Sequence, residues 1–332
     1  MALGSGIVGK SRVSPALERM SPPRLIADRY ELAERIGRGA MGEVWSATDR
    51  ATGDDVAVKI AQGWAVSEPE LVSRFEREGK LLRRMRSPFI CSLVDAGRLP
   101  DETPYIVLER LKGETLESLL EREGYLSLEE AGHIADEILQ ALCVAHAAGA
   151  VHRDLSPSNV FLHQQRDGSV LTKVLDFGIA KVSDASAPRT GNRATMGSLP
   201  YVAPEQLGDS AKAGPRADLY ALGTIMFRAV TGQMPYGDAR GTALVVLKRD
   251  SDPPTIDEVT GERWPASLRT FLTKCMARAP SKRYASAEIA LAALREATRG
   301  KGPRLAVPEK PLEATPTLTF SSRDGNDKRR QR

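Results

Sequence analysis

The chain has 332 residues, of which 27% are charged and 41% hydrophobic, and its formal net charge is +4. This length exceeds that of a typical single domain, and the composition is too apolar for a wholly disordered chain, so we expect a folded body with two lobes. The sequence has no apolar run long enough for a secretory signal or a membrane-spanning helix, which favours a soluble protein without a membrane partner. Cys91, Cys143 and Cys275 lie too far apart to form a Cys-x-x-Cys zinc pair or a disulfide framework, and we therefore predict a reducing, cytoplasmic location.

Both ends of the chain have the composition of unstructured segments. Residues 1–27 contain Ser, Gly and Pro, and residues 299–332 contain four prolines. From residue 300 onward there are eight Lys or Arg against four Asp or Glu, so this tail alone accounts for the positive net charge. We predict a flexible N-terminal segment, a disordered basic C-terminal tail and a nearly neutral body with no dedicated nucleic-acid surface, although the terminal basic residues could contact a polyanion.

The first part of the body has the pattern of an antiparallel sheet. Short β-rich segments separated by turns predict five strands, at residues 30–36, 43–48, 56–60, 91–93 and 105–108. Apolar residues from Leu71 to Met85 fall at helical spacing and predict one helix over residues 67–85. We therefore predict a small lobe, residues 28–110, with five antiparallel strands and one helix.

The pattern becomes helical after Gly113. Ser127 is a good N-cap with Glu130 in the capping-box position, and the helix that it begins is predicted to run to Ala148. Further helices are predicted at residues 217–230, 267–277 and 285–297. The elements together predict an α+β fold in which a larger, mainly helical lobe, residues 111–298, is separated from the small lobe by a cleft.

A glycine-rich turn, residues 37–44, joins the first two predicted strands. Its G-x-G-x-x-G-x-V pattern is a weak signal when taken alone. A dinucleotide-binding site would place such glycines between a strand and a helix, whereas here a second strand follows Gly42. Because residues without Cβ atoms let backbone N–H groups approach phosphates, the turn is either a phosphate loop of a nucleotide site or a merely flexible hairpin.

Lys59 lies seventeen residues after Gly42, inside an otherwise apolar strand. Buried lysines rarely stay unpaired, and Glu78 on the following helix is the natural partner. Such a pair would hold Lys59 extended toward the α- and β-phosphates of ATP. An ordinary surface lysine is the alternative.

Three further motifs carry a family resemblance. They are His152-Arg153-Asp154-Leu155-Ser156-Pro157-Ser158-Asn159, Asp176-Phe177-Gly178 and Ala203-Pro204-Glu205. With these motifs in register, the sequence resembles the eukaryotic-like (Hanks-type) protein kinase superfamily, in its bacterial serine/threonine branch, over about residues 29–298. The resemblance implies a bilobal protein kinase fold over residues 28–298 and a non-specific serine/threonine protein kinase activity. It also implies ATP and Mg²⁺ as cofactors and proteins with Ser or Thr acceptors as partners.

The resemblance also implies roles for individual residues. Asp154 would orient the acceptor hydroxyl and accept its proton, Lys59 would bind phosphate, and Asn159 and Asp176 would supply the hard oxygen ligands that Mg²⁺ prefers. The residues expected to bind ATP are Ile36, Gly37, Arg38, Gly39, Ala40, Met41, Gly42, Val44, Ala57, Lys59, Glu78, Glu109, Leu111 and Phe161. Among them, Val44, Ala57 and Phe161 would enclose the adenine, while Glu109 and Leu111 would offer backbone groups to its edge.

Supporting contacts follow from the same resemblance. A stacked apolar column that ties the two lobes together would consist of Leu82, Leu93, His152 and Phe177. Asp218 would bind the backbone of the catalytic loop, residues 152–159. Glu205 would pair with Arg283 in the large lobe.

The sequence departs from the family at Ser156, where serine/threonine kinases usually have a lysine that contacts the γ-phosphate. Loss of one charge-stabilising donor typically lowers the rate about 100- to 1,000-fold. The alternative to an active kinase is therefore an ATP-binding pseudokinase scaffold. A small-molecule phosphotransferase of similar fold is disfavoured by Ala203-Pro204-Glu205, which resembles part of a protein-substrate platform.

Regulation by phosphorylation is predicted from Arg153, because an arginine beside the catalytic aspartate can pair with a phosphate on the activation loop. Thr190 and Thr195 are the candidate sites, with autophosphorylation in a transient homodimer, although both can be ordinary loop threonines. Gly79 directly follows Glu78 and weakens the predicted small-lobe helix. We predict that Gly79→Ala raises the basal activity.

Overall fold

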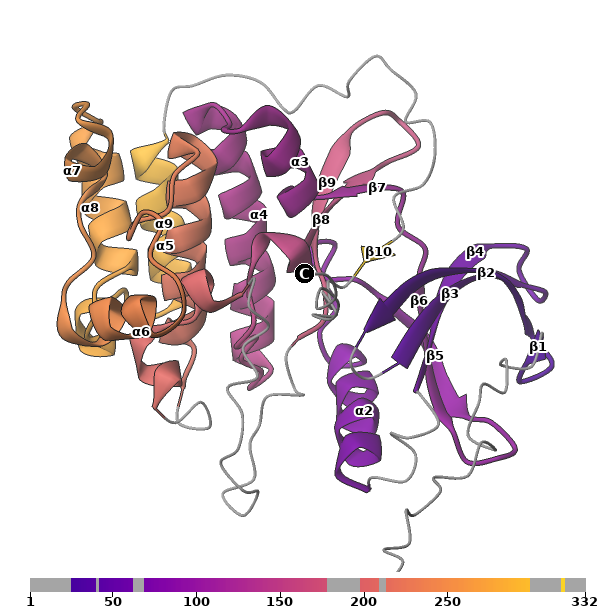
Figure 1. The fold of residues 1–332 in the computed structure, drawn as a ribbon. Coiled ribbons are helices and arrows are strands. Elements are labelled where there is room, and N and C mark those ends of the chain that lie inside the picture. Colours follow the sequence, from indigo (N-terminus) through magenta and orange to yellow (C-terminus); the bar gives the residue numbers. More distant parts are fainter. Residues whose placement is uncertain are drawn as a thin grey trace, which may run out of the picture.

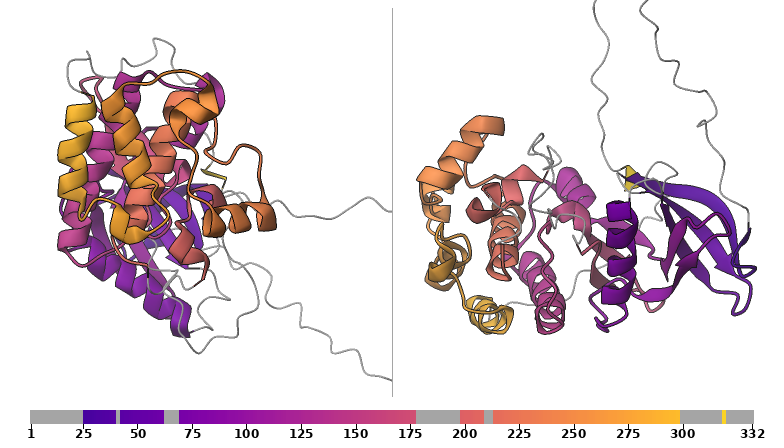
Figure 2. Two further views of the ribbon diagram at one scale, coloured as in Figure 1. Left: turned by 90° about the vertical axis from the view of Figure 1, so that its left-hand side faces the viewer. Right: turned by 90° about the horizontal axis from the view of Figure 1, so that it is seen from below.

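The computed structural model describes residues 25–39, 42–61, 69–177, 198–208, 213–298 and 318–319. These residues form two lobes, one built around a sheet and one built mainly of helices (Figure 1). The right-hand view of Figure 2 shows the same division, with the sheet of the small lobe beside the helices of the large lobe. The predicted α+β, bilobal fold is confirmed.

The small lobe consists of a twisted sheet and the helix α2 (Pro69–Leu82). Its strands, in the order in which they pair, are β1 (Leu25–Ile26), β2 (Tyr30–Gly39), β3 (Gly42–Asp49), β4 (Asp55–Ala61), β6 (Pro104–Glu109) and β5 (Leu93–Arg98). Each of these neighbours is antiparallel, and β10 (Leu318–Thr319) pairs with β2 in parallel. On one side of the sheet, Phe75 of α2 packs on Ala61 and Ile106, which fixes the helix against β4 and β6.

Within residues 28–110 the structure has the five predicted antiparallel strands and the one predicted helix, and two further strands, β1 and β10, extend this sheet to seven. The strand β1 lies within residues 1–27, which were predicted to be flexible. It forms because Ala27 and Asp28 adopt positive φ angles of 51° and 53° and turn the chain back onto β2. Ile26 thereby becomes fully buried. The strand β10 likewise lies within the tail that was predicted to be disordered.

The fourth predicted strand, residues 91–93, was misplaced. The strand β5 begins only at Leu93 and continues to Arg98. It includes Asp95, Ala96 and Gly97, residue types that are uncommon in strands. Pairing with β6 therefore outweighs the weak intrinsic preference of this segment for a strand.

The large lobe contains seven described α-helices and a small second sheet. The helices are α3 (Leu116–Glu123), α4 (Leu128–Ala147), α5 (Arg216–Thr231), α6 (Gly241–Asp250), α7 (Ile256–Thr260), α8 (Ala266–Cys275) and α9 (Ala287–Ala297). The second sheet, which was not predicted, consists of β7 (Gly113–Thr115), β8 (Val160–Gln164) and β9 (Val170–Val174). The helix α4 begins with the predicted capping box, in which Ser127 Oγ accepts from Glu130 N and Glu130 Oε2 accepts from Ser127 N.

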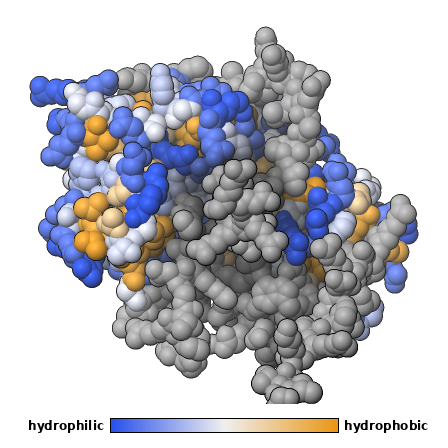
Figure 3. Space-filling view, viewed as in Figure 1, coloured by the Kyte–Doolittle hydropathy of each residue, from blue (hydrophilic) through white to orange (hydrophobic). Residues whose placement is uncertain are grey.

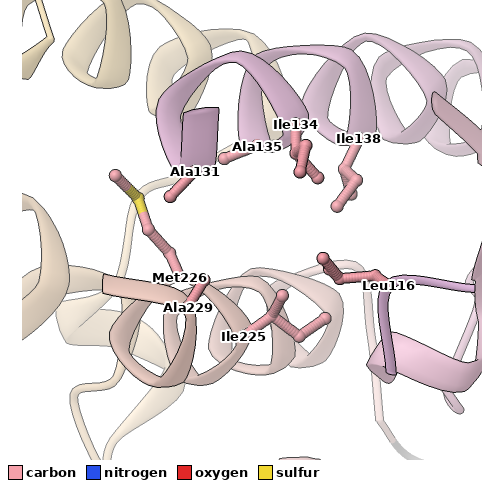
Figure 4. Close-up of a pocket in the computed structure, with 8 residues that line it drawn as sticks. All are labelled: Leu116, Ala131, Ile134, Ala135, Ile138, Ile225, Met226 and Ala229. Carbon is pink, nitrogen blue, oxygen red and sulfur yellow. The ribbon is translucent and has the colours of Figure 1, made fainter. Parts of the chain in front are cut away.

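The core of the large lobe lies where α4 faces α5. Figure 4 shows a small cavity there, with Ala131, Ile134 and Ile138 on one side and Ile225 and Met226 on the other. All its lining side chains are apolar, so it offers no group that could bind a phosphate or a metal.

The outer face of the large lobe is mainly hydrophilic in the view of Figure 3, with hydrophobic residues in small separate groups. Within the described part of the chain, no helix combines the length and the apolarity needed to cross a membrane.

Candidate active site

An ion-pair triad joins the two lobes, and of its three members Glu78 is buried while Lys59 and Asp176 are partly exposed. Lys59 on β4 donates hydrogen bonds of 2.9 Å both to Glu78 Oε1 on α2 and to Asp176 Oδ1, which follows β9. The predicted pairing of Lys59 with Glu78 is thus formed. Burial acts to lower the pKa of Lys59, but the carboxylates of Asp176 and Glu78 outweigh it and raise the pKa above its ordinary value. Burial acts to raise the pKa of Asp176, but the ammonium group of Lys59 outweighs it and keeps the pKa of this carboxyl below its usual range. The triad therefore holds its cation charged at neutral pH.

The predicted catalytic loop, residues 152–159, is held at its start by Asp218 on α5. Its Oδ1 accepts from Arg153 N at 2.8 Å and its Oδ2 accepts from His152 N at 2.9 Å, as predicted. His146 Nε2 lies 2.8 Å from the same Oδ2 atom. Within the loop, Asn159 Nδ2 donates to the backbone oxygen of Asp154 at 2.8 Å. This bond sets the distance between the two residues expected to bind the acceptor and the metal.

Two residues of this site have strained backbones. Arg153 has a φ angle of 62° and Asp176 a φ angle of 40°, in the left-handed region that residues with side chains avoid. Such strain persists only where surrounding contacts over-determine it, and it is concentrated at functional sites. Here the bonds to Asp218 and Lys59 supply those contacts.

Asn159 and Asp176 suit a magnesium ion by their chemistry. Because the amide nitrogen of Asn159 is engaged by a backbone oxygen, its side-chain oxygen is left as an acceptor. Asp176 adds an ionised carboxylate. Mg²⁺ commonly takes only one or two such protein oxygens and completes its octahedron with waters and substrate phosphates. The described residues contain no cluster of three or more His, Cys, Asp or Glu placed to hold a metal.

The glycine-rich hairpin lies directly beside this site. Gly39 pairs with Gly42, and Val44 on β3 lies opposite Lys59 on β4. A Cβ atom on Gly42 would come within 2.1 Å of the carbonyl oxygen of Ile60, so only glycine fits at this position. Of the other hairpin positions, Ile36, Gly37 and Arg38 lie on β2, whereas Ala40 and Met41 lie outside the described residues.

The residues expected around the adenine come from both lobes. Ala57 on β4 and Phe161 on β8 are buried, and Leu111, after β6, is half-buried. The carboxylate of Glu109 accepts from Ser92 N and from Lys173 Nζ, both at 2.7 Å. Lys173 was not predicted as part of the site, although it is a cation inside the apolar strand β9, the same signal that identified Lys59. Its bond joins the segment between the lobes to the strand that leads into Asp176.

The predicted interlobe column is present. Leu82 and Phe177 are buried in one apolar cluster, with Leu93 packed against it, and the rings of His152 and Phe177 are 4.8 Å apart. The predicted pair of Glu205 and Arg283 is also formed, through two bonds of 2.6 and 2.8 Å.

Ser156 carries no charge, and its side chain is buried, so it does not replace the lysine that serine/threonine kinases usually have at this position. It is 3% exposed, and its Oγ lies 2.9 Å from Ser158 Oγ. The expected sites Thr190 and Thr195, as well as Gly178, lie outside the described residues.

Fold and cleft together define the class of a protein kinase domain, and comparisons agree. Residues 30–293 match the family described as protein kinase domain. The serine/threonine-protein kinase PknA of Mycobacterium tuberculosis is 37% identical over 267 residues, which cover 79% of this chain and 59% of PknA. Among solved structures, the M. tuberculosis PknI kinase domain has a TM-score of 0.61 at 26% identity, covering 81% of this chain and 96% of that chain. Rad53 in complex with AMP-PNP has a TM-score of 0.63 at 25% identity, covering 79% of this chain and 64% of that chain.

The chain belongs to the protein kinase family, and its relatives at this level are bacterial serine/threonine-protein kinases. This family generally uses ATP and Mg²⁺. The chain spans 59% of the length of PknA, so properties of the whole relative do not transfer with the domain.

Proposed function

We propose that the chain is an active serine/threonine protein kinase that binds Mg²⁺ and ATP and phosphorylates Ser or Thr hydroxyls of proteins. The observation that carries the proposal is the triad of Lys59, Glu78 and Asp176, which brings strand, helix and magnesium segment together with 2.9 Å contacts. The packed interlobe column supports the same arrangement. The AMP-PNP bound to Rad53, a structural neighbour, supports a nucleotide in this cleft.

The proposed reaction uses residues already in place. The acceptor oxygen forms a bond to the γ-phosphorus while the bond from that phosphorus to the bridging β-oxygen breaks, and ADP leaves. Asp154 orients the hydroxyl and takes its proton. Lys59, held by Glu78, neutralises the α- and β-phosphates, and the glycine-rich hairpin covers them. Mg²⁺, held by Asn159 and Asp176, would supply the charge that stabilises the leaving phosphate.

Ser156 supports a second candidate, an ATP-binding scaffold with little transfer. Its buried hydroxyl is engaged with Ser158 and provides no positive charge for the γ-phosphate. The two candidates differ in one measurable quantity, the rate of phosphoryl transfer.

The test is transfer of label from γ-labelled Mg-ATP to the protein itself and to myelin basic protein. Asp154→Asn should lower the rate about 100-fold or more, because it removes the proton acceptor. Asp238→Asn, an equivalent change at a fully exposed carboxylate, should leave the rate unchanged and serves as the matched control. Ser156→Lys should raise the rate if the missing cation limits it. A wild type that binds nucleotide but transfers nothing, with Ser156→Lys equally silent, would establish the scaffold instead.

Autophosphorylation at Thr190 or Thr195, in a transient homodimer, is part of the proposal. Arg153 lies beside Asp154, and its Nε donates to Ala213 O at 3.3 Å, so its guanidinium group is held near the catalytic loop. Phosphopeptide mapping after incubation with Mg-ATP should locate phosphate on one or both threonines. An initial rate that rises with the square of the enzyme concentration would support transfer between two copies, whereas a first-order rate would contradict it.

A further inference from the structure

Lys248 on α6 is completely buried and plays no part in the site described so far. Its Nζ donates to two backbone oxygens, Pro200 O at 2.5 Å and Val202 O at 2.7 Å. The same ammonium group lies 4.9 Å from the centre of the Tyr220 ring. Burial of a lysine costs free energy, so we expect the hydrogen bonds of Lys248 to serve a role that an apolar side chain could not fill.

The two acceptors belong to one short stretch, residues 198–202, which we call the anchored segment. It contains a single turn of 3₁₀-helix, Leu199–Tyr201, and it leads directly into a second one, Pro204–Leu207. A second cation holds its other side, since Arg228 NH1 donates to the hydroxyl of Tyr201 at 2.6 Å. Backbone oxygens of such short turns lack the ladder partners that a longer helix or a sheet would provide.

The anchored segment is connected to the catalytic loop. Gln206 Oε1 accepts from Ala203 N at 3.0 Å, and its Nε2 donates to the backbone oxygen of Arg153 at 2.9 Å. Arg153 is the residue directly before Asp154. The chain that Lys248 holds is therefore bonded to the loop that carries the Asp154 carboxylate, and it can form one wall of the site to which an acceptor hydroxyl comes.

We propose that Lys248 is a positioning residue for the protein substrate: it fixes the anchored segment so that this wall can receive the acceptor polypeptide beside Asp154. This inference rests on the proposed kinase function. Lys248 does not touch the triad around Lys59, so its effect falls on binding of the acceptor and not on binding of ATP. Loss of its amine removes the donor to both carbonyl oxygens, of the half-buried Pro200 and Val202, and loosens the segment.

The experiment compares Lys248→Met, which keeps the length and apolar body of the side chain, with Arg249→Met on the same helix. Arg249 is exposed, and among the described contacts its side chain pairs only with its neighbour Asp250, while its backbone oxygen accepts from Arg278. For each protein we would measure Kd for myelin basic protein, KM for this acceptor, KM for ATP, and kcat. Hydrogen exchange at residues 198–206 and in α9 would separate local loosening from global loss of stability.

We expect Lys248→Met to raise Kd and KM for the acceptor about tenfold or more, since loss of the donor to one of its two acceptors already corresponds to roughly this factor, with KM for ATP and kcat within about twofold of wild type. Exchange should accelerate at residues 198–206 and stay unchanged in α9, and Arg249→Met should behave as wild type.

An unchanged acceptor Kd, or equal changes in the acceptor and ATP constants, would overturn the proposal. If Lys248→Met does not fold, Lys248→Gln decides by the same criteria. Because Kd requires no catalysis, a wild type that transfers no phosphate refutes the proposed function without affecting this comparison.

Discussion

The two lobes each contain a lysine removed from water, and the two lysines have opposite electrostatic surroundings. Lys59, in the cleft, contacts the carboxylates of Glu78 and Asp176, and its pKa is raised. Lys248, in the large lobe, donates to two backbone oxygens and faces an aromatic ring. Burial and the nearby guanidinium of Arg283 lower its pKa to about 7, against a partly opposing effect of Glu205.

The difference shows that burial alone does not determine what a lysine can do. Where carboxylates face the ammonium group, the charge is permanent and can be presented to phosphates. Where the hydrogen-bond partners are backbone oxygens and a guanidinium group lies nearby, the group serves as a hydrogen-bond donor whose charge is costly. The first lysine suits chemistry, and the second suits positioning of the chain.

The largest expected effect comes from removing the charge at Lys59. Lys59→Met should lower kcat about 100- to 1,000-fold, because the α- and β-phosphates lose their cation and the carboxylates of Glu78 and Asp176 lose the cation between them. Steady-state transfer to myelin basic protein measures this. The matched change Lys248→Met should leave kcat within about twofold. Equal losses of kcat in the two variants would erase the distinction between the two lysines.

The sequence allowed the first lysine to be predicted and not the second, for a physical reason. Lys59 interrupts an apolar strand and has an acidic partner on the next helix, so both members of the pair are visible as residue types. The partners of Lys248 are backbone oxygens, which every residue has and no sequence pattern marks. Lys173 lies between these cases, since it interrupts the apolar strand β9 and its acidic partner Glu109 was already a candidate.

The fold shows the same division between local and distant determinants. The start of α4 followed from the capping box at Ser127 and Glu130, a signal contained in four residues. The strand β5 could not be placed correctly, because its polar residues are strand only through pairing with β6. The strand β1 depends on positive φ angles at Ala27 and Asp28, and an Ala-Asp pair in a sequence does not predict two successive residues in that conformation. The domain limits at residues 28 and 298 and the roles of the cleft residues stay predictions.

A smaller effect is expected from Glu78→Gln, which keeps the shape of the partner but removes its charge. Lys59 retains Asp176, so the cation stays bound while its position becomes less fixed. A charged hydrogen bond contributes about 1.5–3 kcal/mol, and we expect kcat to fall about 10- to 100-fold. Glu76→Gln, on the same helix but paired at the surface with Arg98, is the control and should have little effect. A loss as large as that of Lys59→Met would mean that Asp176 alone cannot hold the lysine.

The pH dependence of stability should differ between wild type and Lys248→Met. The ordinary pKa of lysine, 10.5, applies to the unfolded chain, and the folded value is about 7. Between these values the unfolded chain binds a proton that the folded protein does not, so the stability of wild type rises with pH, while below pH 7 the full cost of the buried charge is present. Thermal unfolding from pH 6 to 9 should therefore show Tm of wild type rising relative to Lys248→Met, by a few degrees. Parallel curves would show that Lys248 does not titrate in this range.

The smallest effect is expected from a substitution at Gly79. It tests whether α2 already holds Glu78 fully in contact with Lys59. A Cβ atom at this position would meet Ala96 at 3.5 Å and Ile106 at 3.8 Å, which are ordinary contacts, so alanine fits. Alanine favours a helix over glycine by about 1 kcal/mol, and α2 carries Glu78 directly beside this residue. If α2 frays in the unphosphorylated protein, Gly79→Ala should raise its basal transfer rate up to about fivefold and add protection from hydrogen exchange in α2. An unchanged or lower rate, with α2 better protected, would mean that the triad is already fully formed and that the Lys59 site cannot be tightened through this helix.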